Sequence, residues 1–110
     1  SNLGHLMEQT VYHHLCRNTD LIINYWKDFM NHEIDFVISE KNLVTELIQV
    51  SFISNEVNLP EREIASLVKA STRFPDAKLI LITWELTQTL FIKNRSIHCI
   101  SLFNWLNSSI

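Results

Sequence analysis

The sequence predicts a single α/β domain in which a mixed β-sheet is flanked by helices. Its 110 residues, 46% of them hydrophobic, provide for one packed core and not for two. Segments with apolar residues at helical spacing enclose segments that alternate between apolar and polar residues. The continuous apolar run at residues 78–83 is typical of a strand buried on both faces. Together these patterns predict a helix, three strands, a helix, three strands and a short closing helix.

The first half of the chain predicts one helix and a three-stranded meander. Residues 3–17 repeat apolar side chains at helical spacing, and residues 21–27 are rich in β-branched and aromatic types. In the next segment, strict alternation places Glu33, Asp35 and Val37 on one face and Ile34, Phe36 and Ile38 on the other. A third strand is expected over residues 44–53, with Ile48, Val50 and Phe52 on one face and Leu47, Gln49, Ser51 and Ile53 on the other.

The second half begins with a helix predicted over residues 58–74. Pro60 is tolerated in its first turn, and Glu61 and Glu63 suit the positive end of its dipole. The apolar strand at 78–83 follows, then two short strands at 88–92 and 96–100, and a helix at 101–107. A meander followed by a crossover helix into a central strand implies a mixed sheet.

Composition excludes several functional classes. A chain with one glycine has none of the glycine-rich loops that cradle nucleotides, because those loops need several residues with positive φ. The net charge of −3 disfavours a strongly basic nucleic-acid-binding domain, although a local basic patch remains compatible with it. No apolar run is long enough for a membrane span. The two cysteines match no metal-ligand spacing, which favours reduced thiols and a cytoplasmic location.

Five polar residues form the candidate site. Asp35 and Glu33 are expected on one strand face, Gln49 and Ser51 on one face of the next strand, and Glu8 at the edge of the first helix. If these faces coincide, the oxygen atoms converge on one point, and hard divalent cations such as Mg²⁺ prefer oxygen ligands. Taken alone, each feature has a plainer interpretation, because an alternating Glu-x-Asp is more often the solvated face of a sheet.

The sequence also resembles a known family. Matching stretches run from residues 3–8 (LGHLME) through 33–37 (EIDFV), 46–51 (ELIQVS) and 81–84 (LITW) to Trp105-Leu106. In this order they resemble the C-terminal domain of prokaryotic AAA-type ATPases, a domain related to the restriction-endonuclease-like, PD-(D/E)xK, superfamily. The resemblance covers nearly the whole chain and implies an αβββαβ core. It also implies that the ATP site lies on an N-terminal ATPase portion outside this chain.

Carried over by position, the resemblance assigns a role to each candidate residue. Asp35 matches the first acid of the motif, a metal ligand, and Glu8 matches an acidic position on a helix. Gln49 stands where an active nuclease has Asp or Glu, and Ser51 stands where it has Lys. Loss of the lysine removes a cation that stabilises charge on the phosphate, a loss of roughly 10² to 10³ in rate. Glu33 lies where it could replace the missing carboxylate.

The resemblance therefore implies a nuclease-like module with a degenerate active site that binds nucleic acid or a protein partner and serves the ATPase. One alternative is an active Mg²⁺-dependent DNA nuclease that uses Asp35, Glu8 and Glu33. A second alternative is an interaction module that dimerises through an edge strand or an exposed apolar helix face. Arg62, Lys69 and Arg73 on the second helix are candidates for phosphate contacts, with a solvated helix face as the plainer interpretation.

Overall fold

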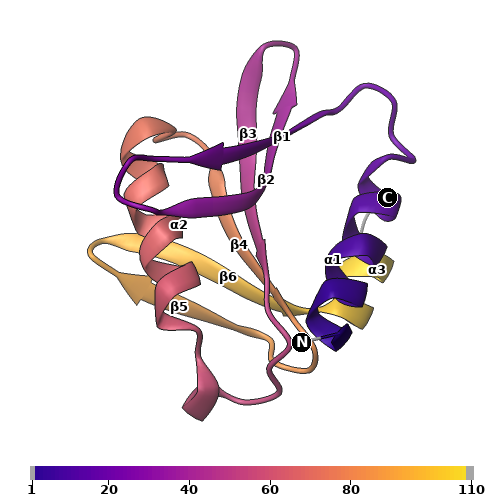
Figure 1. The fold of residues 1–110 in the computed structure, drawn as a ribbon, viewed down its shortest axis with the longest axis vertical. Coiled ribbons are helices and arrows are strands. Elements are labelled where there is room, and N and C mark those ends of the chain that lie inside the picture. Colours follow the sequence, from indigo (N-terminus) through magenta and orange to yellow (C-terminus); the bar gives the residue numbers. More distant parts are fainter. Residues whose placement is uncertain (1, 109–110) are drawn as a thin grey trace.

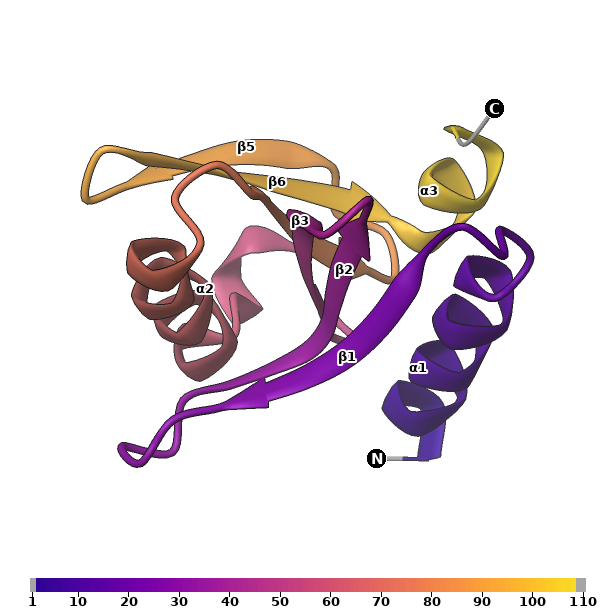
Figure 2. The ribbon, with the colours of Figure 1, turned by 90° about the horizontal axis from the view of Figure 1, so that it is seen from above.

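A six-stranded mixed sheet lies between one helix on its first face and two helices on its second (Figures 1 and 2). The computed structural model describes residues 2–108. Their elements are α1 (Asn2–Leu15), β1 (Ile22–Lys27), β2 (Glu33–Glu40), β3 (Leu43–Val50), α2 (Glu61–Arg73), β4 (Lys78–Thr83), β5 (Gln88–Ile92), β6 (Arg95–Ser101) and α3 (Leu102–Ser108). This order confirms the α/β class and the succession of elements predicted from the sequence.

The strands lie in the order β1-β2-β3-β4-β6-β5. The meander β1-β2-β3 is antiparallel, β4 pairs in parallel with both β3 and β6, and β5 pairs antiparallel with β6. Helix α2 connects the parallel strands β3 and β4, as a crossover connection requires. The apolar strand β4 is therefore central and buried on both faces, as predicted.

Two hairpins are closed by the same two-residue sequence in left-handed backbone. Lys41-Asn42 joins β2 to β3 and Lys93-Asn94 joins β5 to β6, with φ between 50° and 67° at all four residues. Two-residue turns of this kind match the twist of the strands, and asparagine tolerates positive φ better than most residues. Asparagine thus closes turns in which many chains use glycine.

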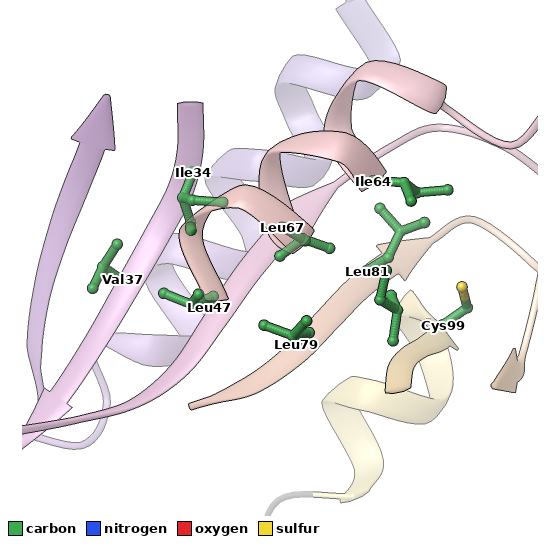
Figure 3. Close-up of a cluster of buried hydrophobic side chains, with 10 residues drawn as sticks. Ile34, Val37, Leu47, Ile64, Leu67, Leu79, Leu81 and Cys99 are labelled. Carbon is green, nitrogen blue, oxygen red and sulfur yellow. The ribbon is translucent and has the colours of Figure 1, made fainter. Parts of the chain in front are cut away.

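The face of the sheet under α2 carries one half of the core. Ile34 and Val37 of β2, Leu47 of β3 and Leu79 and Leu81 of β4 meet Ile64 and Leu67 of α2, as Figure 3 shows. These side chains are at most 7% exposed. The buried residues of α2 recur at helical spacing, which explains why one side of this helix covers the sheet.

The opposite face carries the second half of the core under α1 and α3. Met7, Val11 and Leu15 of α1 and Leu102 of α3 pack on alternate residues of the central strands. His14 and Trp105 join the two helices, with ring centroids 4.9 Å apart and an edge-on arrangement. No helix within residues 2–108 is both long and apolar enough to cross a membrane.

Strict alternation along β2 was wrong, because the strand contains a β-bulge. The pairing with β1 shifts between Asn24↔Val37 and Trp26↔Ile34, so β2 has one residue more than its partner in this interval. Ile34 and Val37 therefore both reach the α2 side, although alternation placed them on opposite faces. Phe36 and Ile38 face α1 and α3.

Two predicted boundaries also differ from the structure. Strand β3 ends at Val50 rather than at residue 53, because the chain bends after Ser51 and the Ile53 N–H turns back to the Ser51 carbonyl at 3.0 Å. The helix predicted from residue 58 begins at Glu61. Its start is delayed because the residue before a proline is kept out of the helical region, and Leu59 has φ −54° and ψ 131°.

Candidate functional site

At the β-bulge of β2, the side chain of Gln49 hydrogen-bonds to the main chain of β2, and the side chain of Asp35 hydrogen-bonds to the main chain of β3. The Asp35 N–H donates to Gln49 Oε1 at 2.9 Å, and the Val50 N–H donates to Asp35 Oδ2 at 2.9 Å. Gln49 Nε2 donates to the carbonyl of Glu33 at 2.7 Å and to that of Glu63, in the first turn of α2, at 3.3 Å. We call these four hydrogen bonds the Asp35–Gln49 clasp.

The clasp joins three elements and satisfies main-chain groups that the bulge leaves without ladder partners. The orientation of the Gln49 amide is determined by its partners, because a main-chain N–H only donates and a carbonyl only accepts. Gln49 is 2% exposed, so these contacts take place out of reach of bulk water. Hydrogen bonds of this kind are obligatory at a buried bulge, because unpaired buried main-chain groups are costly.

Burial and neighbouring acids perturb the Asp35 carboxyl. Its pKa is raised to about 6, first by removal of the charged form from water and then by the negative charges of Glu8, Glu63 and Glu33. The hydrogen bond from the Val50 N–H acts in the opposite direction and is outweighed. Its surroundings therefore disfavour the charged form of Asp35 relative to an Asp side chain in water.

Glu33 is engaged on the neighbouring strand instead of facing Asp35 directly. The Tyr25 hydroxyl donates to Glu33 Oε1 at 2.7 Å, and Lys27 Nζ lies 3.6 Å from the same oxygen. The hydrogen bond from Tyr25, with help from the charges of Lys27 and Arg62, lowers the pKa of Glu33 despite partial desolvation. This exposed cluster holds Glu33 in its charged form.

The faces expected to coincide for Glu8 and Gln49 do not. Ile48 and Val50 of β3 pack on the α1 side, so Gln49 between them faces α2 and bonds to Glu63 there. Glu8, on the half-buried side of α1, is close enough to act on Asp35 through its charge. Ser51 follows the end of β3, and its N–H donates to the Ile82 carbonyl at 2.9 Å. Glu63 is an additional member that the sequence interpretation assigned only to the helix dipole. The signal was its place in the first turn of a helix that follows the site-bearing strand.

The residues present do not fit a magnesium site. Gln49 Oε1, the oxygen expected to replace a carboxylate ligand, accepts the Asp35 N–H. Within residues 2–108, no three His, Cys, Asp or Glu side chains are gathered closely enough to hold a metal ion. Glu8, Glu63 and Glu33 act on Asp35 through their charges without forming such a group with it.

Comparison with protein-family models, with curated proteins and with solved structures found no match to this chain.

Proposed function

We propose that this chain is a nuclease-like module that binds nucleic acid but does not cleave it. The residues at the positions of the cleavage site instead stabilise the fold. The resemblance to the C-terminal domains of AAA-type ATPases supports its association with an ATPase portion of the same protein. Both the restriction-endonuclease-like fold and the ATPase partner are parts of this proposal. The observed order of elements, which begins α-β-β-β-α-β, is compatible with that core.

The observation that carries the proposal is the use of Gln49. Every hydrogen bond of its amide in the clasp goes to the main chain of β2 or α2. The Gln49 amide is thus held between main-chain groups, and at 2% exposure it is closed off from solvent. Asp35 likewise supports β3 through the Val50 N–H. Residues at positions that would carry cleavage chemistry thus act as a structural fastening.

The experiment that tests the proposal is a cleavage assay. Purified chain is incubated with supercoiled plasmid and with a labelled single-stranded oligonucleotide, in millimolar Mg²⁺ or Mn²⁺, beside Asp35→Ala. We expect no cleavage by the wild-type chain above the level of the Asp35→Ala protein. Cleavage that depends on the metal and is abolished in Asp35→Ala would falsify the proposal and favour the alternative of an active nuclease.

A binding measurement completes the test. Fluorescence anisotropy of a labelled oligonucleotide should rise with added protein and fall as salt is increased, because phosphate contacts release counterions. If no oligonucleotide binds at low salt, the nucleic-acid part of the proposal is wrong.

A further inference from the structure

An open groove lies outside the clasp, and no residue of the clasp lines it. It has a volume of about 1080 Å³ and lies on the face of the sheet that carries α1 and α3. None of Glu8, Glu33, Asp35, Gln49 or Ser51 lines it. Its walls are the last turn of α1, the following residues, and α3 with Trp105. Its floor is the amino-terminal half of β4 and β6.

The groove exists because α1 and α3 cover only part of this face. Along the central strands, alternate side chains point to the same side, so Lys78 precedes Ile80 on β4, and Ser96 and His98 precede Ile100 on β6. Ile80 pairs with His98 across these two strands. Lys78, Ser96 and His98 are exposed, whereas Ile82, farther along β4, is fully buried. The uncovered half of the sheet is thus the polar half.

Cationic groups predominate along this groove although the chain as a whole is acidic. Arg17, Lys78 and Arg95 line it together with His14 and His98, against one carboxylate, Glu46. Arg17 Nη1 lies 3.2 Å from His14 Nδ1, which brings the guanidinium to the end of α1. Arg95 Nη1 donates to the Pro75 carbonyl at 3.3 Å, which holds it beside the start of β4. Glu46 is the register partner of Lys78.

The groove also has apolar lining residues. Trp105, Ile80 and Ile100 line it together with the cationic groups, and the ring of His14 contacts the indole of Trp105. Ligand sites commonly combine such an apolar surface with a few placed polar groups. A neighbouring cavity of about 440 Å³ is lined by Glu40, Glu46 and Asp76, which would repel a polyanion in that direction.

We propose that this groove binds a nucleoside phosphate, either free or as part of a nucleic-acid strand, with its phosphate at Arg17 and Lys78 and its base against Trp105. The combination of a guanidinium group, an ammonium group and an apolar wall distinguishes this ligand class from a bare inorganic anion. The proposal deepens the proposed function by naming the surface that makes contact, and in its strand form it rests on that function.

The test compares two pairs of charge reversals. Arg17→Glu with Lys78→Glu changes the groove, and Arg62→Glu with Lys69→Glu makes the same change of net charge on exposed positions of α2, across the sheet. The probes are fluorescein-labelled oligo(dT), followed by anisotropy, and dTMP, followed by calorimetry. Inorganic phosphate serves as the probe without a base. Circular dichroism of each variant verifies that it is folded.

We expect the groove pair to weaken binding by roughly ten- to a hundredfold and the α2 pair by less than about twofold. For oligo(dT), the slope of log K against log salt should fall by roughly 1.4 in the groove pair, because two phosphate contacts are lost. Binding of dTMP should exceed binding of inorganic phosphate and should weaken in Trp105→Ala.

Each outcome separates the two claims. Weaker binding of either probe by the groove pair supports the groove as the binding site. The probe that binds shows whether the ligand is a free nucleotide or a nucleic-acid strand. Equal binding of oligo(dT) by both pairs overturns the groove and leaves the nucleic-acid function standing. Binding of dTMP without binding of oligo(dT) overturns that function and leaves the groove standing. Binding of neither probe overturns both.

Discussion

Gln49 determines the local path of β2 through main-chain contacts that no sequence pattern displays. Its neighbourhood to Asp35 was predictable, because both residues lie on adjacent strands of a meander. The use of its amide was not, because its partners are main-chain N–H and C=O groups that every residue type carries. The sequence therefore indicates a metal ligand at this glutamine, which stands where a nuclease has an acid, whereas in the structure its amide forms the hydrogen bonds of the clasp.

Gln49→Glu should destabilise the chain by about 3 kcal/mol, because a carboxylate cannot donate to the Glu33 and Glu63 carbonyls and would be buried beside them. Urea unfolding measures the change. The same substitution at exposed Gln9 should shift stability by less than about 0.5 kcal/mol. Unchanged stability in Gln49→Glu, or a gain on addition of Mg²⁺, would mean that position 49 is a ligand rather than part of the clasp.

Asp35→Asn should stabilise the folded chain at pH 7 by about 1 to 3 kcal/mol. The amide still accepts the Val50 N–H but has no charge to be repelled by Glu8, Glu63 and Glu33. Because folding raises the pKa of Asp35 to about 6 from its ordinary value of 3.8, the unfolded state binds fewer protons between these values. The wild-type carboxyl therefore favours folding below pH 3.8, and this contribution is lost as the pH rises to about 6.

The advantage of Asp35→Asn should consequently be small near pH 4 and reach its full size above pH 6. Chemical unfolding of both proteins over this range gives the difference, in which the other titrating groups cancel. Asp20→Asn in the exposed loop after α1 serves as the matched control and should have little effect at any pH. A constant difference between wild type and Asp35→Asn would contradict the raised pKa.

At the scale of elements, the order of helices and strands was predictable because each element buries one stripe or one alternating face. The face of each β2 residue was not. Residues 34–38 read Ile-Asp-Phe-Val-Ile, and a run with four apolar residues fits either face after a shift of one. The bulge determines the face to which each of these side chains points, and it is held by Gln49 and Val50 of the next strand. The residues near β2 in the sequence therefore cannot predict it.

The two Lys-Asn hairpin turns are the elements in which local strain can be relieved most simply. Asn42→Gly, at φ 67°, should raise stability by about 0.5 kcal/mol, because glycine has no steric cost in left-handed backbone. Thermal unfolding measures the gain, and Asn94→Gly at φ 64° should reproduce it. Asn24→Gly in the extended strand β1 should instead lower stability. A loss of stability in both turn variants would contradict their left-handed geometry.

At the scale of the whole molecule, charge was the least informative property of the sequence. The net charge of −3 correctly described the average, but cations are gathered at one end of the α1 and α3 face and acids at the clasp. Sequence interpretation pointed to the row of cations on α2 because they share one helix. Arg17 and Lys78 come from separate places in the chain, and both line the groove only because α1 and β4 pack in one domain.

Trp105 connects the helices near the two ends of the described chain. Trp105→Ala should lower stability by about 2 kcal/mol, since the indole packs on the α1 and α3 side of the core and against His14. Its neighbour Phe103 is 73% exposed, so Phe103→Ala should cost less than about 0.5 kcal/mol. Urea unfolding compares the two variants, and equal effects would argue against this contact between α1 and α3.

The shared layer of α1 and α3 has a consequence for the order in which the protein matures during translation. Helix α1 leaves the ribosome before α3, so its apolar stripe meets Leu102 only after α3 has emerged. Until then α3 does not cover the apolar side chains Met7, Val11 and Leu15, and the nascent chain exposes this apolar surface to chaperones. Ribosome arrest at residue 100 should therefore yield a protease-sensitive intermediate. Release of the chain through α3 allows this helix to complete the cover of the sheet face that carries α1.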